Sequence, residues 1–361
     1  MRIHHFYPKT INIGDSFVSL GIRRMIRQVC PQAEFQSFNV NARGDDRLDY
    51  GLTASSIERA NREADLVIVG GSNLYEGRQT WGVSLEAEAL ERLRPPLFLM
   101  GIGVGSGFLA SRPTRPSLRV RQEIVALNRK AYHSTVRDVS TLEWLENLGV
   151  KGVHLAGDPA TFLFSSRLQT EGKGYVALVM PPRRYCPVGT RGRLDYRRWI
   201  MTNGLAFTAR AISRRGYEVR ILCNDHRDEG LARWLIPTLP SGDCVLPATP
   251  EEYFRCLSES RAVVAGRLHS AILSYSMGIP FVLIDVDMRT RGFVRTYDLE
   301  AWAPRPHFLG FRARLTNRVL ELVEGGHRQE WQALIRRRDE MEGRAMTLLM
   351  HAVEGTLQRG G

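Results

Sequence analysis

The amino-acid sequence predicts an α/β protein with two Rossmann-like parallel-sheet domains and a helical tail. One pattern recurs along the chain: a short apolar run, a turn with Gly or Asp, and then a segment with helical periodicity. Strands that alternate with helices in this way form parallel sheets with helices on both faces. A polar stretch at residues 165–174 interrupts the pattern, which then starts again. The 361 residues are enough for two separate cores.

The first domain is expected over residues 1–168, where five apolar runs have the length and composition of buried strands. These runs are RIHHF, ADLVIV, PLFLM, HSTV and GVHLA. The segment SFVSLGIRRMIRQV, after the first run, has the periodicity of an amphipathic helix. The apolar residues expected on one face of this helix are Phe17, Leu20, Met25 and Val29.

The second domain is expected over residues 172–325. Its strands are YVALVM, YEVRILC, RAVVAG and PFVLID, with helical segments between them. Residues 326–361 predict a long amphipathic helix or a helix pair that packs back on the first domain. A peripheral contact with a membrane surface is the alternative role for this tail.

Composition argues against a membrane-spanning, secreted or metal-stabilised protein. No window approaches the roughly 18 apolar residues of a membrane span, and the start MRIHHFYPKT lacks the apolar region of a signal peptide. We therefore expect a cytoplasmic protein, with the inner face of the membrane as the place of any peripheral contact. The five cysteines show neither C-x-x-C nor zinc spacing, so neither a disulfide framework nor a structural metal is predicted.

The net charge of +12 and the pI near 9.9 raise the question of a nucleic-acid partner. Only four of the 50 basic residues are lysines, a bias that coding composition can produce. Apart from Arg336–Arg338 there is no basic run, and none is interleaved with aromatic residues. We therefore predict no nucleic-acid partner. A solvated basic face is favoured, and attraction to an acidic glycan, a lipid phosphate or an anionic substrate is the alternative.

Turns at the carboxyl ends of the predicted strands define where a ligand would bind, because ligands of open parallel sheets sit there. Two domains with these ends facing each other would form a cleft. Each turn taken alone also has a structural explanation, as a tight turn or a helix cap. The residues at these turns are Gly14, Asp15, Gly70, Gly71, Gly101, Gly103, Arg137, Asp138 and Asp158.

The stretch GRLHSAILSYSMGIP carries the clearest chemical signal. Arg267 and His269 lie where a buried strand gives way to a helix expected from about Ser270. The unpaired N–H groups of a helix N-terminus and an adjacent guanidinium together attract an anion, and an imidazole exchanges a proton near neutral pH. The alternative is an ordinary junction with Ser270 as N-cap. Arg289 follows, in a predicted Arg-Thr-Arg turn.

The motifs NIGD, DLVIVGGSNL, GIGVGSG, TVRD, GDPA and GRLHSAILSYSMGIPFVLI occur in that order over residues 10–295. This ordered set resembles the polysaccharide pyruvyl transferases. The resemblance implies a fold similar to the two-domain GT-B glycosyltransferase type. It also implies transfer of the pyruvyl group of phosphoenolpyruvate to two hydroxyls of a sugar, which gives a cyclic ketal and phosphate. Phosphoenolpyruvate is then a co-substrate, and no metal or other cofactor is expected.

The resemblance also assigns roles residue by residue. Arg137 in TVRD corresponds to the arginine of the family's S-V-R-D motif, with Thr135 in place of serine. Arg289 stands where the family usually has lysine, which keeps the charge but changes its shape. The expected donor-binding residues are Arg137, Arg267, Arg289 and Ser270, because a small trianion requires several cations. The expected acid/base is His269, and Asp15 and Asp158 are weaker candidates for orienting the acceptor hydroxyls or the imidazole.

The acceptor is expected to be a saccharide that is free, lipid-linked or polymeric. Segments 106–118 and 181–196 are predicted rims of the cleft, with plain surface loops as the alternative, and Arg183 and Arg184 are the candidate acceptor contacts. One rival is a GT-B glycosyltransferase that uses a nucleotide sugar, although no acid follows His269 closely enough to hold a ribose. A second rival is a non-catalytic glycan-binding protein. The sequence indicates no oligomeric state.

Overall fold

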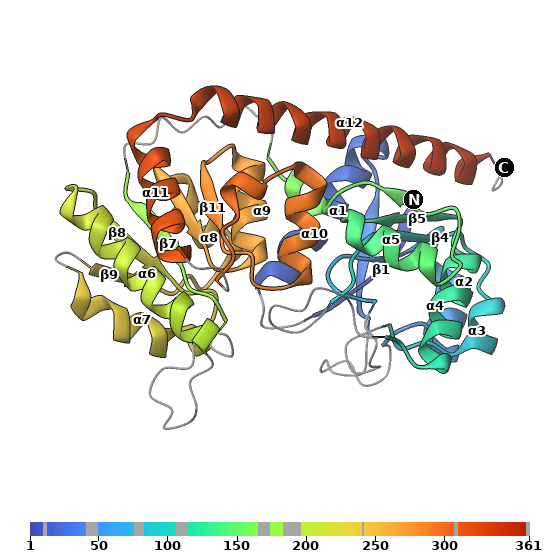
Figure 1. Ribbon diagram of the computed structural model, residues 1–361. Helices are drawn as coiled ribbons and strands as arrows, with labels where there is room; N and C mark the ends of the chain where they lie inside the picture. Colours follow the sequence, from blue (N-terminus) through green and yellow to red (C-terminus); the bar gives the residue numbers. More distant parts are fainter. Residues whose placement is uncertain are drawn as a thin grey trace. The chain divides into compact units, whose positions relative to one another are not determined.

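The computed structural model consists of two compact α/β units, each with its own parallel sheet (Figure 1). We call residues 1–10, 15–163 and 339–361 the N-terminal unit, and residues 11–14 and 164–338 the C-terminal unit. The prediction of two parallel-sheet α/β domains is confirmed. The structure describes residues 1–9, 13–40, 50–75, 83–105, 115–164, 174–182, 196–239, 242–306 and 310–358.

The sheet of the N-terminal unit has the strand order β2-β1-β3-β4-β5-β6, and every described pair is parallel. The five predicted strands are all present, and the sixth, β2, was missed. Its sequence EFQSFN is largely polar, it lies at the edge of the sheet, and its first four residues are exposed or only partly buried. The strands are β1 (Arg2–Tyr7), β2 (Glu34–Asn39), β3 (Leu66–Gly70), β4 (Leu97–Ile102), β5 (His133–Val136) and β6 (His154–Leu155).

Helices of the N-terminal unit follow its strands. The first helix buries Phe17 and Met25 as predicted, but Leu20 is 38% exposed, so its placement on the buried face was wrong. Val18 and Ile22 occupy that face instead, because residues four apart lie on one side of a helix. The helices are α1 (Ile13–Val29), whose first two residues group with the C-terminal unit, α2 (Ala54–Glu63), α3 (Ala87–Glu91), α4 (Leu118–Lys130) and α5 (Val139–Asn147).

The sheet of the C-terminal unit has the order β11-β10-β7-β8-β9, again with parallel pairs. Edge strand β9 has the short sequence GDCV and was not predicted. The strands are β7 (Val176–Val179), β8 (Val219–Leu222), β9 (Gly242–Val245), β10 (Ala262–Ala265) and β11 (Phe281–Leu283). The helices are α6 (Tyr196–Arg214), α7 (Glu229–Leu235), α8 (Pro250–Ser258), α9 (Leu268–Met277), α10 (Met288–Tyr297) and α11 (Phe311–Glu324).

The predicted Arg-Thr-Arg turn is wrong, because Arg289–Arg291 form the first turn of helix α10. Asp287 is its N-cap, and the carboxylate accepts hydrogen bonds from the backbone N–H groups of Arg289 (2.9 Å) and Thr290 (3.1 Å). The Thr290 hydroxyl lies 3.0 Å from the Asp287 backbone N and accepts its hydrogen bond, which completes a capping box. The Asp-x-x-Thr spacing in the sequence was therefore the signal for this helix.

The tail is one helix, α12 (Arg328–Leu357), and not a helix pair. Its residues up to Arg338 group with the C-terminal unit, and those from Asp339 group with the N-terminal unit. Within the N-terminal unit Glu342 lies 3.3 Å from Arg24 of α1. Among the described residues, no helix has the length and apolar character that crossing a bilayer requires.

Arg338 fixes the C-terminal end of helix α9. It is fully buried, and its Nη1 donates hydrogen bonds of 2.7 Å to the carbonyl groups of Tyr275 and Ser276. The indole N–H of Trp331 donates to the carbonyl of Gly278 at 3.2 Å. A guanidinium at this position satisfies the last carbonyls of the helix and complements its negative end. The tail thereby secures the helix whose other end carries Arg267 and His269.

The variant Arg338→Met should lower the free energy of unfolding by about 2–4 kcal/mol, because two buried carbonyl groups lose their donor. The neighbouring Arg337 is 45% exposed and pairs with Asp298, so Arg337→Met should cost less than about 1 kcal/mol. Urea denaturation of both variants measures the difference. Equal destabilisation by the two substitutions would contradict the capping role of Arg338.

Candidate active site

Arg137 is buried in the N-terminal unit directly after strand β5. Its side chain is 2% exposed and does not point to bulk solvent. Nε donates a hydrogen bond to Asp138 Oδ2 at 3.2 Å, and Nη2 donates to the side-chain oxygen of Asn73. Asp138 is also the N-cap of α5, since its Oδ1 accepts from the Thr141 N–H at 2.8 Å. One carboxylate therefore both begins the helix and orients the guanidinium.

Asp158 approaches the same guanidinium from the turn after β6. Its Oδ2 lies 3.8 Å from Arg137 Nη1, and both atoms are buried without a hydrogen bond in the described part of the chain. Burial raises the pKa of Asp158 from 3.8 to about 6, with repulsion from Asp138 and Asp15 adding to the rise and Arg137 opposing it. An acid with this pKa can exchange a proton near neutral pH.

The glycines of GIGVG bring backbone against this cluster. A Cβ on Gly103 would lie 2.2 Å from Arg137 Nε, and one on Gly101, where φ is +60°, would lie 2.3 Å from Pro159 Cδ. The glycines of GGSNL have other neighbours. A Cβ on Gly70 would meet Ile22, and one on Gly71 would meet Val18, both on helix α1. Gly103 is therefore the predicted cleft glycine that contacts a predicted donor-binding residue.

Arg267 lies at the carboxyl end of β10 in the C-terminal unit, as the N-cap residue of α9. Its side chain extends across the neighbouring strand. Nε donates to the carbonyl of Met180 at 3.2 Å, and Nη2 donates to Asp228 Oδ1 and lies 3.6 Å from Asp225 Oδ2. Burial raises the pKa of Asp228; the charge of Arg267 opposes this rise, and the charge of Asp225 adds to it. Two carboxylates therefore surround one guanidinium.

The loop that supplies these carboxylates was missed at the sequence level. It follows β8, and Asn224 organises it: the Asn224 N–H donates to Asp228 Oδ2 at 3.1 Å, and the Tyr253 hydroxyl donates to Asn224 Oδ1 at 2.9 Å. The sequence NDHRD directly follows the predicted strand YEVRILC. Acidic residues at the carboxyl end of a strand were therefore the available signal.

His269 occupies the first turn of α9, with Gly14 against its ring. A Cβ on Gly14 would lie 1.9 Å from His269 Nδ1, so the imidazole position requires glycine there. Ser270 is fully buried, and its hydroxyl donates to the Arg267 carbonyl at 2.6 Å. The helix begins at Leu268 with Arg267 as N-cap, so the alternative of an ordinary junction with Ser270 as N-cap is wrong in this respect. The Ser270 hydroxyl instead secures the strand-to-helix junction.

Arg289 lies at the same edge of the sheet as Arg267. Their strands β11 and β10 are parallel neighbours, with Leu283 opposite Ala265. Arg289 Nε donates to Asp287 Oδ2 at 2.9 Å. Different carboxylates hold the two guanidiniums, and Arg137 belongs to the other unit. Arg183, Arg184 and residues 106–114 of the predicted rims lie outside the described residues.

Comparison with known proteins assigns the chain to a family. Residues 12–288 match the sequence model of the polysaccharide pyruvyl transferases. The chain belongs to this family. The protein is therefore a transferase of glycan biosynthesis, and the family implies a polysaccharide acceptor. No curated protein sequence matches the chain significantly.

Solved structures of GT-B epimerases and glycosyltransferases share the fold of this pyruvyl transferase family member. UDP-GlcNAc 2-epimerase from Neisseria meningitidis has a TM-score of 0.60 at 11% identity, with 98% of this chain and 100% of that chain covered. A putative UDP-N-acetylglucosamine 2-epimerase from Listeria monocytogenes has a TM-score of 0.58 at 13% identity, with 99% of this chain and 97% of that chain covered. A ugt transferase from Siraitia grosvenorii has 0.53 at 9%, covering 99% of each chain. These identities show the fold alone.

The buried Asp158 predicts a specific pH dependence of stability. Between pH 3.8 and about 6 the native state keeps a proton that the unfolded state has lost, so the free energy of unfolding falls as pH rises through this window. Asp158→Asn should remove this contribution. The free energy of unfolding of the variant should therefore rise by about 1–3 kcal/mol relative to that of the unmodified protein between pH 4 and pH 7. Urea denaturation across this range is the measurement.

Asp243→Asn, at a carboxylate that is 64% exposed, is the matched control and should leave the curve parallel to that of the unmodified protein. If the free energy of unfolding of Asp158→Asn differed from that of the unmodified protein by the same amount at every pH, this would contradict the proton uptake assigned to Asp158.

Proposed function

We propose that the protein transfers the pyruvyl group of phosphoenolpyruvate to two hydroxyls of a saccharide, with release of phosphate. The observation that carries this proposal is the junction between β10 and α9, where Arg267 and His269 flank a helix N-terminus. The acceptor is free, lipid-linked or polymeric, and the reaction takes place in the cytoplasm. Phosphoenolpyruvate is a co-substrate, and the proposal includes no metal or other cofactor.

Arginine side chains would neutralise the negative charges of the donor. Phosphoenolpyruvate carries a carboxylate and a phosphate on three carbons, which guanidinium groups bind well as planar donors. The contacts of Arg267 with the described residues use Nε and Nη2, and a guanidinium carries five N–H donors. The N–H groups at the start of α9 would add their dipole. We assign the remaining positive charge to Arg289 and Arg137.

Proton transfer is the role proposed for His269. One sugar hydroxyl attacks the enol carbon, and its proton is delivered to the methylene carbon, which becomes a methyl group. The second hydroxyl then attacks the same carbon and displaces phosphate, and its proton leaves with the phosphate. His269 would accept and donate at least one of these protons. Asp158, with its pKa raised to about 6, is the second candidate, and Asp15 would orient a hydroxyl.

An assay for phosphate release separates this proposal from a nucleotide-sugar reaction. The protein is incubated with phosphoenolpyruvate or with nucleotide diphosphate sugars, together with a panel of free and lipid-linked saccharides. We expect release of phosphate from phosphoenolpyruvate and an acid-labile pyruvyl group on the saccharide. His269→Ala should lower the rate by about 10²–10⁴-fold. Release of a nucleoside diphosphate, or an unchanged rate in His269→Ala, would overturn the assignment.

Gly14→Ala should lower kcat by about 10²-fold, because its methyl group would occupy the position of the His269 ring and displace the imidazole. Gly343→Ala is the control, since a Cβ at this helical glycine meets nothing within 4 Å. Steady-state kinetics of both variants, with circular dichroism to verify folding, is the measurement. Full activity of Gly14→Ala would mean that the imidazole position is unimportant for turnover.

A further inference from the structure

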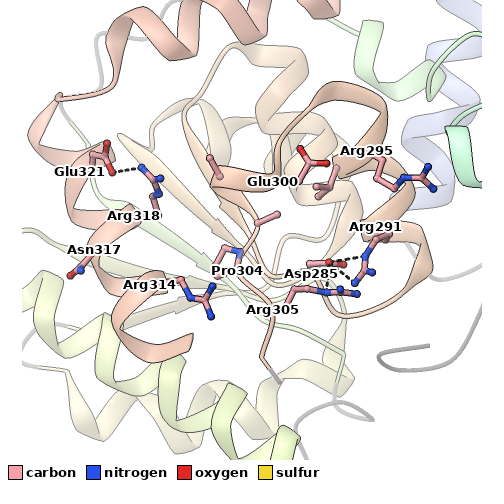
Figure 2. Close-up of a pocket in the computed structure, with 13 residues that line it drawn as sticks. Asp285, Arg291, Arg295, Glu300, Pro304, Arg305, Arg314, Asn317, Arg318 and Glu321 are labelled. Carbon is pink, nitrogen blue, oxygen red and sulfur yellow. Dashed lines mark hydrogen bonds and ion pairs between the residues drawn. The ribbon is translucent and has the colours of Figure 1, made fainter. Parts of the chain in front are cut away.

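A pocket of about 700 Å³ lies between helices α10 and α11 of the C-terminal unit (Figure 2). Its described lining includes five arginines and three carboxylates, which gives a formal charge of +2. Asp285 and Arg291 lie on one side, and Figure 2 shows the side chains of α11, among them Arg314 and Arg318, on the opposite side. An arginine-rich cavity of this size attracts an anion larger than a single inorganic ion.

The pocket is separate from the candidate active site within the same unit. Arg289 and Arg291 are two positions apart on α10, so their side chains leave the helix in nearly opposite directions. Arg289 pairs with Asp287, whereas Arg291 pairs with Asp285. The residues Arg267, His269 and Arg289 do not line the pocket.

Asp285 holds two guanidinium groups in place at this pocket. The carboxylate is 3% exposed, and its Oδ2 accepts hydrogen bonds from Arg291 Nε (3.0 Å) and Nη2 (2.9 Å). Arg305 Nε forms an ion pair with the same oxygen at 2.9 Å. The buried Nε makes no hydrogen bond in the described structure. One negative charge therefore faces two positive charges, and donor capacity remains for a further oxyanion.

The rest of the lining suits a sugar ring. Arg318 is fixed by Glu321 at 2.7 Å and by the ring of Trp302, whose centroid is 5.0 Å from the guanidinium carbon. Apolar side chains, among them Val294 and Pro304, cover another part of the wall. Saccharide sites combine apolar surface for the ring with fixed polar groups for its substituents. A rigid guanidinium recognises a carboxylate or a phosphate through paired hydrogen bonds.

We propose that this pocket is a second binding site, for a saccharide whose ring carries an oxyanion, either a uronate carboxylate or a phosphate. The inference rests on the charges and shape of the pocket and not on the transfer chemistry. It identifies an acidic glycan as the class of molecule that the C-terminal unit holds beside its candidate active site. Binding is therefore expected whether or not the protein consumes phosphoenolpyruvate.

Isothermal titration calorimetry of the 361-residue protein tests this site. The probes are methyl glucuronide, glucose 1-phosphate, neutral methyl glucoside and inorganic phosphate. We expect both acidic sugars to bind at least about tenfold more tightly than the neutral sugar, because the oxyanion supplies charge-assisted hydrogen bonds. Both should also bind more tightly than inorganic phosphate, which lacks the ring. Saturating phosphoenolpyruvate should leave their affinity unchanged.

The double variant Arg295→Gln with Arg314→Gln removes two exposed guanidiniums of the pocket, and its affinity for both acidic sugars should fall at least about tenfold. Arg312→Gln is the control, because Arg312 lies on α11 but stacks over Phe207 at 4.4 Å and does not line the pocket. The affinity of this control variant for both acidic sugars should stay within about twofold of that of the unmodified protein.

Several results would overturn the proposal. They are equal binding of the neutral sugar, equally tight binding of inorganic phosphate, competition by phosphoenolpyruvate, equal losses in the control variant, and absence of binding by both acidic sugars.

Discussion

The need to neutralise buried or partly buried guanidinium groups governs the chemistry at the ends of both sheets. Arg137 and Arg267 each have two carboxylates around them, and an unpaired charge in such surroundings costs several kcal/mol. The carboxylates are tied to the fold, because Asp138 caps α5 and Asp228 is fully buried in the loop after β8. Each cation is therefore oriented by groups that secondary structure already holds.

This arrangement changes how an anionic donor would bind. A trianion brought to Arg137 would share the guanidinium with Asp138 and Asp158, and ionised carboxylates would repel it. Burial raises the pKa of Asp158 and that of Asp228, so a proton taken up by either acid would remove one negative charge and weaken the repulsion. Donor binding and proton uptake are then linked, and the acids that position the arginines would also adjust the charge of the site.

The central strands and the strand-to-helix junctions could be predicted from sequence because they depend on local patterns. Edge strands β2 and β9 could not, since short or polar edge segments lack a continuous apolar run. The link between Arg267 and Asp228 joins residues 39 positions apart, and only the strand order brings them together. Arg338 belongs to a run that reads as a charged surface, yet tertiary packing buries it against the end of α9.

A crystal structure of the protein with phosphoenolpyruvate tests the central claim most directly. We expect the carboxylate and phosphate of the donor to contact Arg137, Arg267 and Arg289, with the His269 ring beside the reacting carbons. A donor that binds at full occupancy without contacting Arg267 and His269, or that occupies the pocket beside Asp285 instead, would contradict it.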